Sequence, residues 1–323
     1  MTDQLLTNPQ QIHEFDNLEL LARQVVEGFI IGLHKSPFHG FSVEFAEHRL
    51  YNPGDAIRNI DWKVYARTDK MFVKKYEEET NLRCCIVLDA SSSMYFPENA
   101  GQSGAPRLNK LQFSAICGAA IMNILKRQRD AVGMAVFSDE VEFQSGARST
   151  NVHQNMLTNK MVELLNRRDK IYARNNTDRL KRQTAAARCL HQIAENVHRR
   201  SLVVVFSDMF ENMEDTEEIF SALQHLRYNK HEVILFHVVD KAHEMEFEFE
   251  NRPYVFVDLE SGEEVKIQPN QVKTFYKEQM SKFFNTLKLR CGQFNIDFVE
   301  TDINQDFRQV LLPYMLKRNK MNG

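Results

Sequence analysis

The sequence predicts an α/β protein with a doubly wound, mostly parallel sheet, an N-terminal extension and an accessory β-hairpin. From about residue 82 onward, short apolar segments alternate with segments that have the periodicity of amphipathic helices. Apolar segments of this length suit parallel strands that are covered by helices on both faces. Regular strand–helix alternation is typical of a parallel α/β sheet.

Five apolar segments are predicted to form the central strands. They are Cys84–Leu88, Ala131–Phe137, Leu202–Phe206, Val233–Val239 and Phe294–Val299. Between them, apolar residues recur with a helical period in two stripes, one from Leu108 to Leu125 and one from Leu180 to Val197. His191 lies on the second stripe, where a hydrogen-bonded core histidine is a better interpretation than a ligand.

Two regions depart from this alternation. Residues 1–80 contain a helix-like stretch, Leu18 to Leu33, but too few apolar residues for a core of their own. We therefore expect residues 1–80 to pack on an α/β domain that comprises residues 81–323. Within that domain, residues 253–267 hold two strand-like runs around Glu260-Ser261-Gly262-Glu263, which predicts a hairpin with a glycine turn.

Charge and hydropathy exclude several function classes. The chain has 323 residues, and 41 basic residues against 44 acidic residues leave a net charge of −3. This balance argues against a general nucleic-acid binder, which needs a basic excess. No apolar run approaches the ~20 residues that span a bilayer, and no signal peptide is recognisable. We expect a cytoplasmic protein that does not insert into a membrane.

The five cysteines include the adjacent pair Cys84–Cys85 but no CxxC pair. This spacing supports neither a zinc site nor a thioredoxin-type motif. Buried, reduced thiols in a reducing compartment are the interpretation that the pattern favours.

The motif that carries chemistry follows the first predicted strand directly. Asp89-Ala90-Ser91-Ser92-Ser93 is a D-x-S-x-S sequence, which presents one carboxylate and two hydroxyls. In a doubly wound sheet, ligands bind beyond the carboxyl ends of the strands. Asp208, after the strand Leu202–Phe206, and Thr177, in a loop before a helix, are candidates for the same edge. Oxygen donors of this kind suit Mg²⁺ or Mn²⁺ better than zinc. Alternatively, Ser91 and Ser93 cap a helix and Asp208 ends its strand in a turn.

This set of residues resembles the metal-ion-dependent adhesion site of von Willebrand factor A domains. The resemblance implies that Ser91 and Ser93 bind the metal directly and that Thr177 does so directly or nearly so. It also implies that Asp89 and Asp208 act mainly through bound waters, and that one coordination position stays open for a carboxylate of a protein partner.

The N-terminal part carries a narrower resemblance. Phe41 to Phe45, then Arg49-x-Tyr51-x-Pro53-Gly54-Asp55, Arg58-x-Ile60-Asp61-Trp62 and Ala66-Arg67 precede the D-x-S-x-S loop in order. This arrangement is similar to the bacterial family catalogued as domain of unknown function 58. The resemblance implies a partner, a MoxR-type AAA+ ATPase, for which the chain would serve as an adaptor or co-chaperone.

The charged residues of this segment have two interpretations. Arg49, Asp55, Arg58, Asp61 and Arg67 alternate in sign around Trp62, the only tryptophan of the chain. We favour a charge network that pins the segment to the sheet, with Trp62 as an apolar anchor. The alternative is a docking surface for the ATPase. The acidic run from Glu244 to Glu250 is typical of a solvated face.

An enzyme is the main competing function. Ser91 stands where a haloacid dehalogenase-type phosphatase needs a second acidic residue, and G-x-S-x-G, phosphate-binding glycine loops and HExxH are absent. We therefore predict a binding module rather than an enzyme. A metal-dependent hydrolase without a recognisable motif and a structural subunit with an inactive metal site stay open. A general base near the metal site would favour the hydrolase, because binding requires none.

Overall fold

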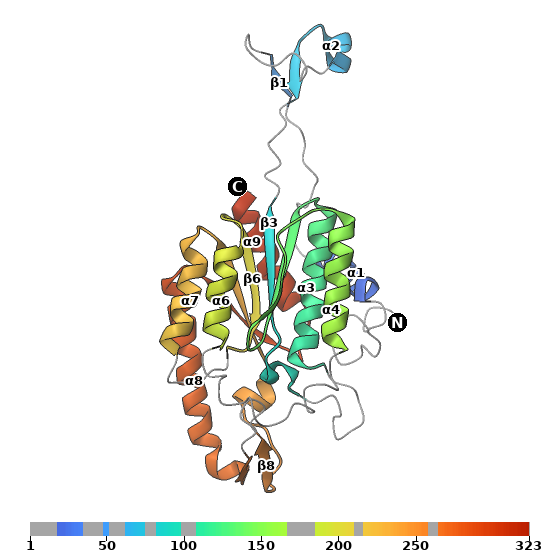
Figure 1. Cartoon of the computed structure of the whole chain (residues 1–323). Helices are drawn as coiled ribbons and strands as arrows, with labels where there is room; N and C mark the ends of the chain where they lie inside the picture. Colours follow the sequence, from blue (N-terminus) through green and yellow to red (C-terminus); the bar gives the residue numbers. More distant parts are fainter. Residues whose placement is uncertain are drawn as a thin grey trace. The chain divides into compact units, whose positions relative to one another are not determined.

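The computed structural model of the chain describes residues 18–34, 48–51, 62–74, 82–97, 108–166, 185–209, 216–257 and 264–322 (Figure 1). The chain divides into two compact units. One comprises Met1–Ile30 with Leu82–Gly323 and holds the α/β fold, and the other comprises Ile31–Asn81.

A six-stranded sheet with the order β10-β7-β6-β3-β4-β5 forms the centre of the α/β unit. Its strands are β3 (Arg83–Asp89), β4 (Ala131–Phe137), β5 (Val141–Gln144), β6 (Leu202–Ser207), β7 (Glu232–Val239) and β10 (Asp297–Asp302). All neighbouring pairs are parallel except β4 and β5. The α/β fold class with a mainly parallel sheet is confirmed.

The strand order reverses between β3 and β6. From β3 the chain adds β4 and β5 on one side, then returns to place β6, β7 and β10 on the other. β3 and β6 are therefore direct neighbours, with Leu88 paired to Phe206 close to their carboxyl ends. Such a reversal opens a crevice at the carboxyl edge, because the connections on the two sides leave in opposite directions.

Buried side chains on both faces account for the apolar segments of the sequence. Every residue of β6 is buried. Val203 and Val205 belong to a cluster with Leu190 and Leu223, which come from helices on one face of the sheet. Burial on both faces leaves the central strands without the polar alternation of a solvent-facing sheet.

Helices cover both faces of the sheet, with α3 and α4 on one side and α6 and α7 on the other (Figure 1). The helices of the unit are α1 (Leu18–His34), α3 (Lys110–Arg127), α4 (Asn151–Leu165), α6 (Ala185–Asn196), α7 (Thr216–Tyr228), α8 (Pro269–Gln293) and α9 (Arg308–Asn322). Gly118 lets α3 approach the sheet closely, since a Cβ atom there would lie 3.3 Å from Ile86 and from Met161.

Among the predicted central strands, the last one differs most from the structure in its bounds. The last strand begins at Asp297 rather than Phe294, because α8 continues to Gln293 and a left-handed Asn295 (φ 54°) turns the chain. The hairpin is confirmed: β8 (Tyr254–Val257) pairs antiparallel with β9 (Glu264–Ile267), and its turn lies outside the described residues. His191 is partly buried, with its Nδ1 2.9 Å from Nδ1 of His225, in agreement with a hydrogen-bonded histidine.

The smaller unit contains a two-stranded antiparallel sheet and a short helix. β1 (His48–Leu50) pairs with β2 (Phe72–Lys74), and α2 spans Trp62–Thr68. Of the predicted charge network, Arg49 lies in β1, and Trp62 and Arg67 lie in α2. Asp55, Arg58 and Asp61 fall outside the described residues. Trp62 is 55% exposed and meets Tyr65 edge-on, so its cover by the α/β unit stays a prediction.

All five cysteines are buried and none forms a disulfide bond, as the sequence predicts. In the part of the chain that the structure describes, no helix is long and apolar enough to cross a membrane.

Candidate functional site

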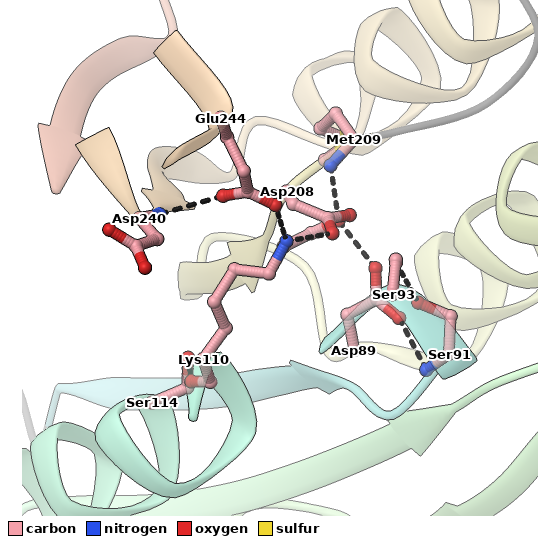
Figure 2. Close-up of polar contacts among 10 residues, drawn as sticks. Asp89, Ser91, Ser93, Lys110, Ser114, Asp208, Met209, Asp240 and Glu244 are labelled. Carbon is pink, nitrogen blue, oxygen red and sulfur yellow. Dashed lines mark hydrogen bonds and ion pairs between the residues drawn. The ribbon is translucent and has the colours of Figure 1, made fainter. Parts of the chain in front are cut away.

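The candidate site lies at the carboxyl edge of the sheet, where the strand order reverses (Figure 2). Asp89 is the last residue of β3, and Ser207 ends β6 directly before Asp208. The predicted residues Asp89, Ser91, Ser93 and Asp208 therefore meet at one edge, although more than 100 residues separate Ser93 from Asp208.

Asp89 is fixed by donors from two strands. Its Oδ1 accepts a hydrogen bond from the backbone N–H of Ser91 at 2.9 Å, and its Oδ2 accepts one from the hydroxyl of Ser207 at 2.5 Å. Ser207 Oγ in turn accepts the backbone N–H of Met209 at 2.9 Å. Met209 is buried with a left-handed backbone (φ 50°), which is costly for a non-glycine residue and is seen at functional sites.

The two serines of the motif point toward each other. Ser91 Oγ lies 3.1 Å from Ser93 Oγ, and both residues are partly buried. Ser91 precedes the 3₁₀ turn η3 (Ser92–Tyr95), yet its side chain makes no capping hydrogen bond. A capping role therefore does not explain Ser91, whose hydroxyl instead forms a pair of oxygen donors with Ser93.

Asp89 is a buried carboxylate beside a second one. It is 3% exposed, and no ion pair joins it to a basic side chain within the described residues. Burial, and then the negative charge of Asp208, raise the pKa of Asp89 to about 6, although the hydrogen bonds from Ser207 and Ser91 act against this shift. The site therefore favours an additional positive charge close to Asp89.

Asp208 has a buried cation as its partner. Lys110, the first residue of α3, places its Nζ 2.7 Å from Asp208 Oδ2 and 2.5 Å from Glu244 Oε1. The side chains of Lys110 and Asp208 are 0% and 1% exposed, and that of Glu244 is 14% exposed. Burial alone lowers the pKa of Lys110, but the two carboxylates outweigh this effect and raise the pKa above its usual value. Lys110 is therefore charged, although it is buried.

Two contacts link Lys110 to the loop that carries the serines. Its backbone N–H donates to the carbonyl of Phe96 at 3.0 Å, and its Nζ lies 6.0 Å from the centre of the Phe96 ring. Phe96 N–H in turn donates to the carbonyl of Ser93 at 3.1 Å. The start of α3 and the D-x-S-x-S loop therefore form one hydrogen-bonded unit.

Glu244 reaches the site from a π-helical turn, η5 (Lys241–Met245), which follows β7. Its Oε2 accepts the backbone N–H of Asp240 at 2.7 Å, while Oε1 accepts from Lys110. Asp240 Oδ2 lies 2.7 Å from His243 Nδ1, and its Oδ1 accepts from Asn304 at 3.0 Å. A histidine oriented by a carboxylate thus lies one residue from Glu244.

Three residues of the candidate site, Ser207, Lys110 and Glu244, are not among the site residues predicted from the sequence. The prediction that Glu244 belongs to a solvated face is wrong, because the side chain is buried against Lys110. A signal for Lys110 was available, since a lysine in the first turn of a helix opposes the macrodipole and needs a reason. Thr177 lies outside the described residues.

The described donors fit a hard divalent cation. Among these residues, no group of three or more His, Cys, Asp or Glu is arranged to hold a metal. Serine hydroxyls can also bind a metal, although serine is not one of these four residue types. The hydroxyl oxygens of Ser91 and Ser93 and the carboxylate of Asp89 gather at one loop. Mg²⁺ uses few carboxylates and keeps several waters, so such a set suits it better than it suits zinc. Asp89 agrees with this fit, because it has no ion pair among the residues that the structure describes.

A family comparison covers most of this architecture. The model of the family described as "Protein of unknown function DUF58" matches residues 47–282, which include the loop, Lys110, Asp208 and Glu244. The chain belongs to the DUF58 family. Membership confirms the narrower resemblance seen in the sequence, and it assigns no activity, because the family's function is unknown.

The relatives that the sequence matches are described as uncharacterized proteins. Proteins of Mycobacterium bovis and Mycobacterium tuberculosis are 27% identical to this DUF58 chain over 152 residues, which is 47% of this chain and 46% of each relative. The match thus spans just under half the length of these relatives.

Two solved structures have low similarity to the DUF58 chain. One is the conserved hypothetical protein BatB from Bacteroides thetaiotaomicron, with a TM-score of 0.39, 16% identity, and coverage of 75% of this chain and 98% of the other. The other is an aerotolerance-related membrane protein from Bacteroides fragilis, with a TM-score of 0.39, 15% identity, and coverage of 74% and 99%.

Proposed function

We propose that this DUF58 chain is a metal-dependent protein-binding module of the von Willebrand A type. In this proposal, Ser91 and Ser93 hold a Mg²⁺ or Mn²⁺ ion, Thr177 contributes directly or nearly so, and Asp89 and Asp208 act mainly through waters. When bound, the metal supplies an electrophilic position for a carboxylate of a partner protein. The observation that carries the proposal is Asp89, a buried carboxylate beside two convergent hydroxyls and with no ion pair in the described residues.

In this proposal, hydrogen bonds within the site hold the side chains in place. Ser207 and the Ser91 backbone hold the Asp89 carboxylate in one orientation from two strands. Met209, directly after Asp208, has a left-handed backbone. The site thus consists of side chains fixed before any ligand arrives, which reduces the entropic cost of binding.

The proposed partner is a MoxR-type AAA+ ATPase, with this chain acting in the cytoplasm as its adaptor or co-chaperone. This proposal is supported by the family membership and by the resemblance to that family in the sequence, which implies such a partner. A single carboxylate gives little selectivity by itself, so the surrounding surface has to contribute an interface of ordinary size or a weak, transient one. The segment around Arg49, Trp62 and Arg67 is a second candidate surface.

The first test measures the metal alone. We expect calorimetry on the full chain to show one Mg²⁺ or Mn²⁺ ion bound, and the same ion to raise the melting temperature by mass action. Ser91→Ala should weaken binding at least tenfold, because it removes a proposed direct ligand, and Asp89→Ala should weaken it as well. Ser92→Ala is a matched control, since Ser92 lies between the two motif serines. Equal affinities in all four proteins would overturn the site.

The second test measures the partner. We expect the cognate ATPase to bind the wild-type chain and Ser92→Ala in Mg²⁺, to bind Ser91→Ala and Asp208→Ala much more weakly, and to bind none of them in EDTA. Circular dichroism confirms that each variant remains folded. Undiminished binding of folded Ser91→Ala in EDTA would move the docking surface away from the metal edge, toward the Arg49–Arg67 segment.

One observation favours a second candidate function, a metal-assisted hydrolase. His243 Nδ1 lies against Asp240, and Asn304 orients Asp240, which is the arrangement of a general base held by a carboxylate. The His243 ring also faces Phe96 of the loop, with ring centres 6.2 Å apart. Mg²⁺-dependent hydrolysis of a phosphate or carboxylate ester that disappears in His243→Gln would support this function. A binding module keeps its partner affinity in the same variant.

A further inference from the structure

At the carboxyl edge, the ion pairs among the described residues include Asp208 and Glu244 but leave out Asp89. Asp89 and Asp208 are buried and the Glu244 side chain is 14% exposed; among the described residues, the ammonium of Lys110 lies against Asp208 and Glu244 (Figure 2). Within the described residues, the ion pairs of Lys110 reach Asp208 and Glu244 but not Asp89. The negative charges of Asp208 and Glu244 are thus compensated by a cation of the chain itself. In the described residues, the charge of Asp89 is not.

The position of Lys110 is unfavourable for a lysine unless nearby carboxylates compensate its charge. A lysine as the first residue of a helix lies at the positive end of the macrodipole, where acidic residues are favoured. Its full burial adds a desolvation cost, which only close carboxylates offset. Both costs are met by the 2.7 Å and 2.5 Å ion pairs, which join α3 to the end of β6 and to η5.

We propose that the ammonium of Lys110 is a built-in cation, which takes the place of a second metal ion beside Asp208 and keeps Asp208 out of the direct ligand set. The inference rests on the proposed function and deepens it. It states that Lys110 sets both the number of metal ions that bind and the affinity of the site for the metal. A tethered ammonium leaves one divalent ion to the Asp89–Ser91–Ser93 loop. Its positive charge also opposes that ion, so the affinity stays modest and reversible.

Removing the ammonium should therefore strengthen metal binding. In Lys110→Met the apolar stem is retained, Asp208 is released, and the repulsion between Nζ and the divalent ion disappears. We expect the Mg²⁺ or Mn²⁺ affinity to rise at least tenfold by calorimetry. Without metal the variant should melt below the wild-type chain, and saturating metal should raise its melting temperature by more than it raises that of the wild type. A residue that only pins α3 to the sheet would give lower or unchanged affinity.

Two further variants make the test decisive. Lys126→Met is the matched control, because Lys126 lies on the same helix in an exposed ion pair with Glu19, at 3.2 Å, and its loss should leave the affinity unchanged. Lys110→Met/Glu244→Gln removes one charge of each sign, so it keeps the net charge of the site while it still releases Asp208. We expect this variant to fold without metal and to bind it more tightly than the wild type.

The outcomes separate this inference from the proposed function. Affinity of folded Lys110→Met or of the double variant at or below the wild-type value overturns the inference alone. Failure of both variants to fold with metal present also overturns it, because the metal should replace the lost charge. Binding in Lys110→Met but not in the wild type supports the built-in cation and overturns the metal dependence of the wild-type chain. No binding in any variant overturns both.

Discussion

Two carboxylates of similar burial have different partners at the carboxyl edge. Asp208 lies against the ammonium of Lys110, whereas Asp89 accepts hydrogen bonds only from neutral groups in the described residues. Their surroundings, rather than their chemistry, give them separate roles. This difference is the reason why the proposed metal is assigned to the D-x-S-x-S loop rather than to Asp208.

His237 is a second residue whose charge is set by burial. It lies in β7, is 0% exposed, and has Phe284 and Phe298 within 5.6 Å of its ring centre. Burial lowers the pKa of His237 to about 4, although the nearby Asp208 acts in the opposite direction. The imidazole is therefore neutral in the folded chain at physiological pH.

We expect His237 to make the chain less stable as the pH falls from about 6.5 toward about 4, because the unfolded chain then binds a proton that the folded chain does not. Well above about 6.5 the residue is neutral in both states and contributes no pH dependence. In His237→Phe, the stability relative to wild type should increase by about 2 kcal/mol between pH 7 and pH 5. Urea unfolding at several pH values measures this difference, and parallel pH profiles would contradict it.

At the scale of elements, the start of α3 positions the cation of the site. Asn109 is the N-cap: its side chain accepts the backbone N–H of Gln112 at 2.8 Å, and Gln112 Oε1 accepts the backbone N–H of Asn109 at 3.1 Å. This reciprocal capping box satisfies helix donors that burial would otherwise leave without partners. It also fixes the backbone of Lys110, the next residue.

Asn109→Ala should therefore lower the free energy of unfolding by about 1 kcal/mol or more. Thr150 caps α4 through a single longer contact, 3.4 Å to the backbone N–H of His153. Thr150→Ala should cost less, because that distance exceeds the ordinary range for N–H···O bonds. Chemical denaturation of both variants compares them directly. A larger loss in Thr150→Ala would show that cap geometry does not set these stabilities.

At the scale of the whole molecule, residues 18–30 of α1 belong with the α/β unit, and the last four residues of the helix belong with residues 31–81. Leu18, Ala22 and Val26 of α1 are buried, and Glu19 forms an ion pair with Lys126 of α3. The predicted packing of residues 1–80 on the sheet thus concerns two separate segments, of which α1 has contacts in the structure. For residues 31–80 the packing stays a prediction.

We expect a fragment of residues 82–323 to be insoluble or molten, because it lacks α1 and exposes the apolar side chains that α1 covers. A chain in which a flexible Gly/Ser linker replaces residues 31–81 keeps residues 18–30 of α1, which include its buried side chains, and serves as the matched control. Cooperative melting of the linker chain alone would assign the stabilising role to α1. Native-like melting of both proteins would show that the whole N-terminal region is dispensable for folding. Loss of cooperative melting in both proteins would support packing of residues 31–81 on the α/β unit.

Much of the α/β unit could be predicted because its pattern is local. The central strands are apolar on both faces, so Ala131–Phe137 was predicted with the bounds that the structure shows. The end of β3 could also be placed, since Asp89 follows an apolar run directly. The start of β10 could not, because Phe294 continues the apolar character of the strand while its backbone still closes α8.

The sequence by itself determined the fold class, the hairpin, the buried thiols and the loop with Asp89, Ser91 and Ser93. The hairpin, the thiols and the loop depend on patterns within a few residues, and the fold class depends on the order of such local patterns along the chain. Only the tertiary structure decided the partners of the buried charges. Lys110 meets Asp208 and Glu244 across 98 and 134 residues of sequence, and their pairing follows from the strand order rather than from any local pattern. Charge compensation acts through space, so a buried cation is recognised once the fold has brought its carboxylates together.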